Sequence, residues 1–534
     1  MRLGQIRFYV ECEKPWMAVN MQTWNCVGLL VVLVIPFGCR STSAPSAVVP
    51  YHASVPYQAS STSASYFNAP KKESEVVKAS ANAVIVANPI NEVPASSPES
   101  TAVQSIDLTT ALMMTTGQNP QIAFARARIE EALAQLDRAN ALKLPSLRAG
   151  VNYNKHEGRI QDVAGTVIET SRGSFYSGIG ANAVGAGSPA VPGIVSQFHF
   201  ADAIFQPKIA QRTACARQAS ALATTNDQLL ATALAYTELM RAEQELSVAN
   251  DIVARAHGLE KSTSEFEKAG EGLASDHDRA RTELALRRID QVRAEEASAI
   301  ASARLAEIIR WNSEQRLLPS EPQLVPIELV RTDCTQQELI AQALSNRPEL
   351  SESRHLVGEA VERLKRERHA PLVPSVLLSA SYGGLGGGLG GDLTNYGDRF
   401  DADAAAFWEV RQLGLGEHAA QRDARSRITQ AKMRELATMD RVAREVNESF
   451  AQIQSRRKQI AITQEAVTAA NDSFEKNWDR IRNGQGLPIE ALQSIQALAT
   501  SRREYVRAVS DFNISQFTLQ RSLGWPVGEP ARND

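Results

Sequence analysis

The chain has 534 residues, and its 57 lysines and arginines nearly balance 60 aspartates and glutamates, for a formal net charge of −3. This balance gives no reason to expect a nucleic-acid partner, because such partners favour a strongly basic surface. Aromatic residues make up only 6%, a composition that suits long helices with small residues at their contacts better than thick globular cores.

The first 39 residues predict a signal peptide. Residues 26–38 form an apolar run of 13 residues, which is too short for the ~20 residues of a membrane-spanning helix and fits the apolar region of a secretory signal. The run ends in Gly38-Cys39, which resembles a bacterial lipoprotein cleavage box and makes Cys39 the candidate lipidation site. An ordinary signal peptide with an incidental cysteine remains the alternative.

Residues 40–104 are rich in Ser, Ala, Pro and Val and show no sustained period. Such composition predicts a flexible or extended linker that joins the signal segment to the folded part.

The remainder consists of two copies of one unit. Pro145 recurs as Pro374 at an offset of 229, and Trp311 recurs as Trp525 at an offset of 214. The second copy is therefore 15 residues shorter (229 − 214 = 15), and the deletion lies between residues 153 and 270, where an inter-strand loop is expected. The predicted divisions are a first repeat at 105–312, an inter-repeat linker at 313–334, a second repeat at 335–526 and a C-terminal tail at 527–534.

Each copy begins with helical segments and then enters a strand through a Pro-Ser pair. Apolar and polar residues alternate over 147–153 and again over 376–382. Such alternation is typical of a membrane strand with one face to lipid and one to water, and a half-buried strand of a soluble sheet shows it as well. Loops are predicted at about 156–196 and 383–391, and second strands at 198–205 and 401–410.

Long helices are predicted at 206–269 and 415–482, and each is followed by a Gly-x-Gly turn and a returning helix. At ~1.5 Å per residue, sixty-odd residues reach about 90–100 Å. Alanines recur at helical spacing, which favours close packing of antiparallel helices, although alanine is also a good helix former anywhere on a surface.

Two strands per copy make four strands in all, and four strands cannot close a barrel. Only closed barrels satisfy the backbone in lipid, and known ones have at least about eight strands. Strands in the membrane would therefore be shared by several chains, and three chains would supply 3 × 4 = 12 strands.

At this point residues 106–525 resemble the TolC-like outer-membrane efflux protein family. The resemblance is carried by the order and doubling of Asn119-Pro120, the Pro-Ser entries, the Leu413-Gly-Leu-Gly416 junction, the Gly-x-Gly-Leu tips and Leu523-Gly-Trp525. It implies a mainly α fold with a small β part: long coiled helical hairpins form a periplasmic tunnel, and four transmembrane strands per protomer share a trimeric 12-stranded barrel.

The resemblance also implies a function. The chain would be a homotrimeric channel of a tripartite efflux or type I secretion system, located in outer-membrane lipid and extending into the periplasm. It would passively conduct cargo from a periplasmic adaptor (membrane fusion) protein and an inner-membrane transporter to the exterior. No enzymatic activity, cofactor or metal is expected, and Asp276-His277-Asp278 does not predict a metal site because consecutive helical side chains do not converge.

The resemblance assigns functional positions to the two turns between the long helices. An acidic position just after the tip would line the aperture, which falls on Glu490 with Asp276 as its first-copy counterpart. Both acids also suit the positive N-terminal end of the returning helix, and that alternative stays open. A second acidic position of the family is Gln493 here, which argues against strong cation selectivity. The residues expected to dock an adaptor are Gly270, Gly272, Leu273, Gly484, Gly486, Leu487 and Pro488.

A periplasmic coiled-coil scaffold lipoprotein with soluble strands is the competing hypothesis. A channel needs a lipid-facing apolar band and detergent-resistant trimers, whereas a scaffold needs neither. The cargo is not encoded in any motif that we can identify.

Overall fold

The computed structural model describes residues 103–144, 146–147, 149–180, 194–312, 315–330, 334–390 and 395–527. The chain divides into two units, residues 1–99 and 100–534, and all described residues belong to the second. The predicted signal segment, Cys39 and all but the last two residues of the predicted linker lie outside the described residues.

The Asn-Pro landmarks mark junctions between pairs of short helices. In the first copy α1 (Leu108–Gln118) meets α2 (Pro120–Ala141), and in the second α5 (Gln336–Asn346) meets α6 (Pro348–His369). The Asn119 side chain accepts a hydrogen bond of 2.8 Å from the backbone N–H of Gln121. Proline follows each junction because the first helical position needs no N–H donor.

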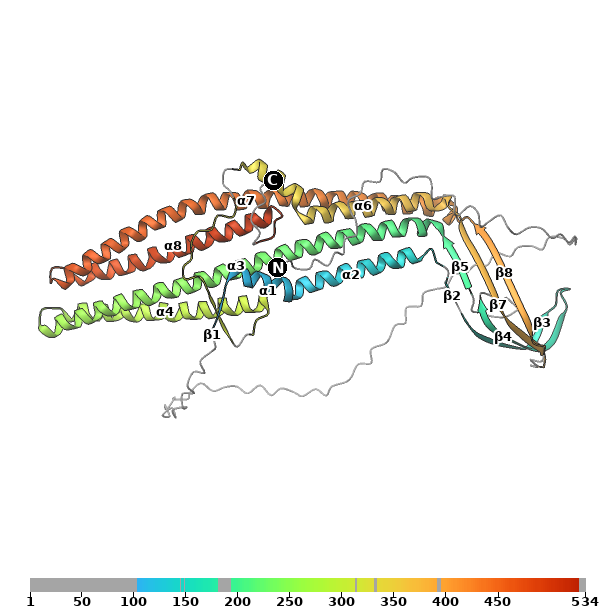
Figure 1. The fold of residues 1–534 in the computed structure, drawn as a ribbon, viewed down its shortest axis with the longest axis horizontal. Coiled ribbons are helices and arrows are strands. Elements are labelled where there is room, and N and C mark those ends of the chain that lie inside the picture. Colours follow the sequence, from blue (N-terminus) through green and yellow to red (C-terminus); the bar gives the residue numbers. More distant parts are fainter. Residues whose placement is uncertain are drawn as a thin grey trace, which may run out of the picture. The chain divides into compact units, whose positions relative to one another are not determined.

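Four long helices form two antiparallel hairpins, as predicted. They are α3 (Phe200–Ala269) with α4 (Ala274–Ile309), and α7 (Leu415–Arg482) with α8 (Pro488–Ser522). Figure 1 shows the two hairpins running alongside each other, with their turns at one end and the strands beyond the other end of the helices. Helix α7 has its predicted bounds, and α3 begins six residues before its predicted start (206 − 200 = 6).

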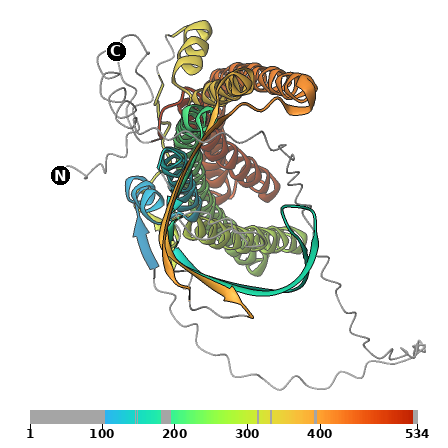
Figure 2. The same cartoon turned by 90° about the vertical axis from the view of Figure 1, so that its right-hand side faces the viewer.

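Six antiparallel strands form one sheet: β2 (Ser146–Leu147), β3 (Ala149–Gln161), β4 (Val167–Gly180), β5 (Ile194–His199), β7 (Ser375–Leu389) and β8 (Gly397–Phe407). Strands β4 and β5 pair with one continuous strand, because Gly180 lies opposite Ser381 and Ile194 opposite Ala380. Likewise β2 pairs with β5 and β3 with β4. The six elements therefore occupy four strand positions, two per copy, in a curved sheet (Figure 2).

The predicted loops of the sheet region were wrong. Strand β3 continues to Gln161, and β4 and β7 occupy much of the glycine-rich sequence. The reason is close backbone contact: a Cβ added at Gly387 would lie 2.7 Å from the carbonyl oxygen of Gly173 on the neighbouring strand. Glycine here permits strands to approach rather than a loop to move.

The predicted second strands also need correction. The strand expected at 198–205 is wrong, because α3 begins at Phe200 and the first-copy strand ends at His199. Its second-copy counterpart, expected at 401–410, is β8 at Gly397–Phe407.

The length difference between the copies has a definite place in the sheet. Residues 181–193 separate β4 from β5, whereas the corresponding strand of the second copy, β8, runs without interruption. The extra residues of the first copy therefore fall within its second strand. They do not fall at the inter-strand turn, where the sequence placed them.

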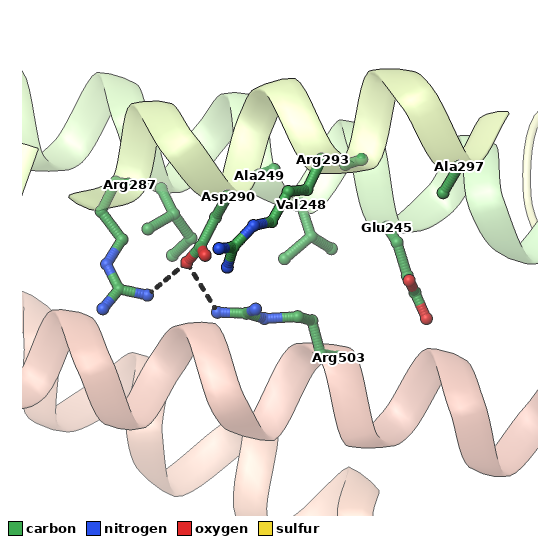
Figure 3. Close-up of a pocket in the computed structure, with 10 residues that line it drawn as sticks. Glu245, Val248, Ala249, Arg287, Asp290, Arg293, Ala297 and Arg503 are labelled. Carbon is green, nitrogen blue, oxygen red and sulfur yellow. Dashed lines mark hydrogen bonds and ion pairs between the residues drawn. The ribbon is translucent and has the colours of Figure 1, made fainter. Parts of the chain in front are cut away.

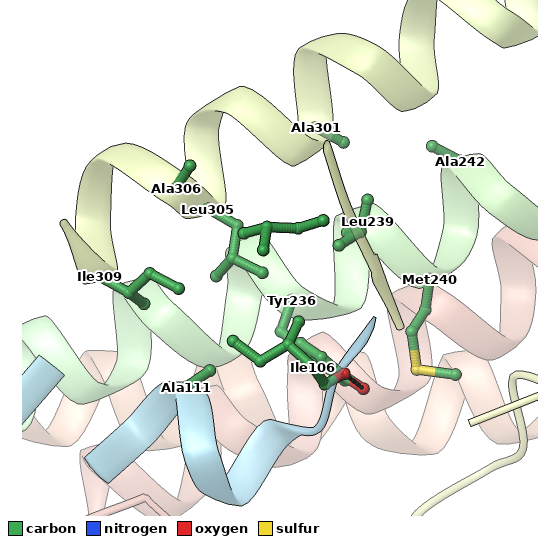
Figure 4. Close-up of a cluster of buried hydrophobic side chains, with 11 residues drawn as sticks. Ile106, Ala111, Tyr236, Leu239, Met240, Ala242, Ala301, Leu305, Ala306 and Ile309 are labelled. Atoms are coloured by element: carbon green, nitrogen blue, oxygen red, sulfur yellow. Dashed lines mark hydrogen bonds between the residues drawn. The ribbon is translucent and has the colours of Figure 1, made fainter. Parts of the chain in front are cut away.

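A buried cluster joins the start of the first repeat to the linker between repeats. Strand β1 (Val103–Ile106) pairs in parallel with β6 (Arg316–Pro319). The Tyr236 hydroxyl donates a hydrogen bond of 3.2 Å to the carbonyl oxygen of Ile106. The apolar side chains of this cluster include Ile106, Ala111, Leu239, Leu305 and Ile309 (Figure 4).

None of the helices in the described part of the chain is both long enough and apolar enough to cross a membrane.

Candidate functional site

The two hairpin turns have the same backbone conformation. Gly270 and Gly484 follow their helices with φ angles of +77° and +68°. Glycine adopts this left-handed region without a Cβ penalty, which lets the turn satisfy the last helical carbonyls. The N–H of Glu271 donates to the Phe266 carbonyl at 2.9 Å, and the N–H of Gln485 donates to the Arg480 carbonyl at 2.8 Å.

The second glycine of each turn lies directly against the preceding helix. A Cβ on Gly272 would be 2.9 Å from the Cβ of Phe266, and one on Gly486 would be 2.9 Å from the backbone nitrogen of Ile481. The Gly-x-Gly spacing is thus explained in both copies: one glycine supplies positive φ and the other permits close contact.

The turns of the two hairpins line a common groove of about 330 Å³. Leu273 and Leu487, the residues that precede the returning helices, are exposed and make no side-chain capping hydrogen bond. Six of the seven predicted docking residues line this groove, and Gly270 does not. The lining residues are Thr263, Phe266, Glu271, Gly272, Leu273, Asp276, Ile481, Gly484, Gly486, Leu487 and Pro488.

The two predicted aperture acids occupy different environments. Asp276 lines the groove, and its carboxylate lies 3.3 Å from the guanidinium of Arg279. Glu490 is not among the lining residues, and its carboxylate lies 2.9 Å from the guanidinium of Arg480. Both acids are in the first turn of the returning helix, where the helix dipole favours a negative charge.

A histidine that the sequence had dismissed joins the helices of the first hairpin. The Nδ1 atom of His277 lies 2.6 Å from a carboxylate oxygen of Glu267, and its Nε2 atom lies 3.3 Å from one of Glu260. Hydrogen bonds to Glu267 and then to Glu260 raise the pKa of His277 above its ordinary value. Both ring nitrogens donate only in the imidazolium form, so this geometry requires a proton shared within the trio.

The second hairpin replaces this polar contact with an apolar one. At the repeat offset of 214, the counterparts of His277, Glu267 and Glu260 are Ala491, Ile481 and Phe474. All three counterparts are buried in one hydrophobic cluster. Comparing the copies position by position would have revealed the exchange, because a charged trio aligns with an apolar trio.

No group of three or more histidine, cysteine, aspartate or glutamate side chains capable of holding a metal ion occurs among the described residues. The candidate site is therefore a pair of shaped hairpin turns, and its geometry suits contact with another macromolecule.

The arrangement defines a class. Solved structures with the same fold are outer-membrane channels. VceC of Vibrio cholerae gives a TM-score of 0.64 at 16% identity, over 78% of this chain and 96% of that one. CmeC of Campylobacter jejuni gives 0.67 at 14%, over 79% and 87%. The open state of MtrE of Neisseria gonorrhoeae gives 0.64 at 16%, over 80% and 91%.

The family follows from the sequence of the second copy. Residues 339–525 match the family described as outer membrane efflux protein. The resemblance to TolC-like outer-membrane efflux proteins is therefore confirmed, by this domain and by the fold of the described chain. The mainly α class with long helical hairpins and a small sheet is confirmed as well. No curated protein matches the chain.

Proposed function

We propose that the chain is the outer-membrane channel component of a tripartite efflux or type I secretion system. It passively conducts cargo from a periplasmic adaptor and an inner-membrane pump to the exterior. The observation that carries the proposal is the sheet. Its outer strands, β3 and β8, each pair on one side only within the described chain, and it lies at the end of the helices opposite the hairpin turns.

The exposed face of this sheet is apolar in both copies. Register places Tyr382 opposite Phe400 and Tyr153 opposite Phe175, so these side chains project from one face. Tyr153, Tyr382 and Phe400 are exposed. An exposed apolar surface of this kind marks contact with a membrane or a protein. Lipid supplies no hydrogen bonds to an open strand edge, so β3 and β8 would pair with further copies.

A homotrimer follows as part of the proposal, since three copies would close the sheet at twelve strands. The groove between the hairpin turns would then receive the adaptor, and the acids after the turns would lie near the periplasmic opening. This role needs no catalytic residue. Acylation of Cys39 would add a lipid anchor.

The decisive experiment expresses the tagged full chain in a Gram-negative host. The membranes are fractionated, and the protein mass is measured in detergent and its conductance in planar bilayers. The proposal expects a trimer in the outer-membrane fraction that conducts ions. A soluble monomer or dimer without conductance would instead support the periplasmic scaffold.

Glu490 provides a selectivity prediction for the conducting trimer. A ring of carboxylates at a constriction attracts cations, so Glu490→Gln should lower the cation-to-anion permeability ratio. The Arg480 guanidinium at 2.9 Å already offsets part of that charge, so we expect a change of about twofold or less. Reversal potentials in a salt gradient measure the ratio. Asp423→Asn, an exposed acid in the upper part of α7, is the control, and an equal effect there would contradict an aperture role.

A further inference from the structure

The two repeats of one chain contact each other through α3 and α8. Ile252 and Leu259 of α3 are buried in one cluster with Ile495 of α8. At the edge of this contact, a carboxylate oxygen of Asp251 lies 2.5 Å from the guanidinium of Arg502. An apolar strip flanked by an ion pair therefore holds the first hairpin against the second.

The duplication leaves two helix faces without this contact. At the offset of 214, α3 corresponds to α7 and α4 corresponds to α8. Within the chain α3 has α8 to pack on, but α7 has no α4 in the equivalent position. Val506 on α8 is 8% exposed whereas its counterpart on α4, Val292, is 63% exposed. The counterpart of Val248 is Ile462 on α7, which is 66% exposed.

The ion pair is duplicated as well. Arg502 corresponds to Arg288, and Asp251 corresponds to Glu465. Both counterparts keep the sign of the charge, both are exposed, and neither has an ion-pair or hydrogen-bond partner among the described residues. They lie on α4 and α7 respectively, on opposite sides of the duplicated unit.

Two grooves show the same relation. The first, of about 220 Å³, lies between α3 and α4 and is closed by Arg503 of α8, whose guanidinium reaches Asp290 at 3.4 Å (Figure 3). Its counterpart lies between α7 and α8 and is lined by Ile462 and Arg507 among others, with no third helix. The residue that corresponds to Arg503 is Ile289 on α4, which is exposed.

We propose that α4 of one copy packs against α7 of the next copy as α8 packs against α3 within the chain. Arg288 then forms an ion pair with Glu465 of the second copy, while Ile289 and Val292 cover the exposed Ile462. The inference rests on the proposed assembly and specifies its helical interface. The two faces differ, so the contact is head-to-tail and can close into a ring.

Cross-linking tests this register in the full chain. Copies carrying Arg288→Cys are co-expressed with differently tagged copies carrying Glu465→Cys, and the assembled protein is treated with a short bis-maleimide. The expected result is a covalent dimer that carries both tags and is absent when either variant is expressed alone. The matched control is the double variant Asp251→Cys with Arg502→Cys, which should cross-link within one chain and leave the dimer band unchanged.

The outcomes separate the interface from the function. A conducting trimer whose Arg288→Cys and Glu465→Cys copies do not join, while the control pair does, overturns the proposed contact and leaves the channel intact. Joined copies in a protein that does not conduct support the contact and count against the channel. Cross-linking of Arg288→Cys copies to one another would indicate a two-fold contact and overturn the head-to-tail arrangement.

Charge reversal provides a second measurement that needs no cysteine. Arg288→Glu should speed subunit exchange between labelled oligomers by roughly two- to fivefold, the scale of one exposed ion pair. Adding Glu465→Arg should restore the original rate. Arg304→Glu, an exposed reversal on the same helix outside the duplicated pair, is the control. Failure of the double variant to recover would mean that the two residues do not meet.

Discussion

At the scale of single residues, His277 distinguishes the two hairpin turns. It lies between Glu260 and Glu267 of α3, and His257 lies 3.6 Å from the same Glu260. The charged groups next to it on α4 are Asp276 and Asp278, and the corresponding trio of the second hairpin is apolar. Protonation therefore affects the first turn and not the second.

This asymmetry predicts a pH dependence. Because the pKa of His277 is raised in the folded state, its stabilisation of the turn is complete below the unfolded value of about 6.5 and is lost as pH rises through the folded pKa. Hydrogen exchange should show protection of the first turn that declines relative to the second as pH rises. The second turn corrects for intrinsic exchange rates, and in His277→Gln the difference between turns should no longer vary with pH.

Gly272 predicts a steric effect at the same turn. In Gly272→Ala the new Cβ would lie 2.9 Å from the Cβ of Phe266 and 3.1 Å from the backbone nitrogen of Glu267, so the backbone must move. We expect a loss of about 1–3 kcal/mol in the opening free energy of the turn, measured by limited proteolysis. Gly117→Ala is the control, because nothing lies within 4 Å of that Cβ, and a helical alanine there should be neutral or slightly stabilising.

At the scale of elements, an ionic network joins four helices of the two repeats. The Arg347 side chain, 3% exposed, lies 2.9 Å from Glu349 and 2.5 Å from Glu445 of α7. Arg521 of α8 contacts both of these acids and also Asp227 of α3. The helix junction that begins with Arg347 is therefore fixed to both long hairpins.

Removing the buried member of this network should be costly. Arg347→Ala leaves Glu349 and Glu445 with one guanidinium fewer, and we expect about 3–5 kcal/mol of destabilisation. The midpoint of chemical unfolding in detergent measures the change. Arg354→Ala on the same helix is the matched control: its side chain is 55% exposed and 3.8 Å from Glu435, so a change within about 0.5 kcal/mol is expected. Similar losses in both variants would count against a structural role for the network.

At the scale of the whole molecule, the sheet has to satisfy two environments. Alternation along β8 places Phe400, Ala402, Ala404 and Ala406 on one face and Arg399 and Ala405 on the other. A lysine on the lipid side of a membrane strand costs about 2–4 kcal/mol at the bilayer midplane, and one on the wet side costs little.

Phe400→Lys should therefore reduce the amount of detergent-resistant oligomer in the outer-membrane fraction, and Ala405→Lys should not. Quantitative blotting of unheated samples measures both. Equal tolerance of the two lysines would show that neither face contacts lipid, and it would favour the scaffold hypothesis over the channel.

Much of the element pattern could be read from the sequence because it follows from local rules. The bounds of α7, the Gly-x-Gly turns and the first strands depend on helical propensity, on positive φ at Gly270 and Gly484, and on alternation along a strand. The doubled spacing of Pro145 and Trp311 established the duplication without any structure. These features require knowledge only of neighbours along the chain.

Other features depended on contacts between distant segments. The glycine-rich run of β7 is a strand because β4 lies against it, and the second first-copy strand ends at His199 because α3 begins there. The trio of His277, Glu260 and Glu267 forms because the hairpin brings α4 back alongside α3. The sequence by itself determined the repeat, the long helices and their turns, since those follow from local spacing. The tertiary structure decided strand extent, register and the partners of buried charges, because these depend on what packs across the chain.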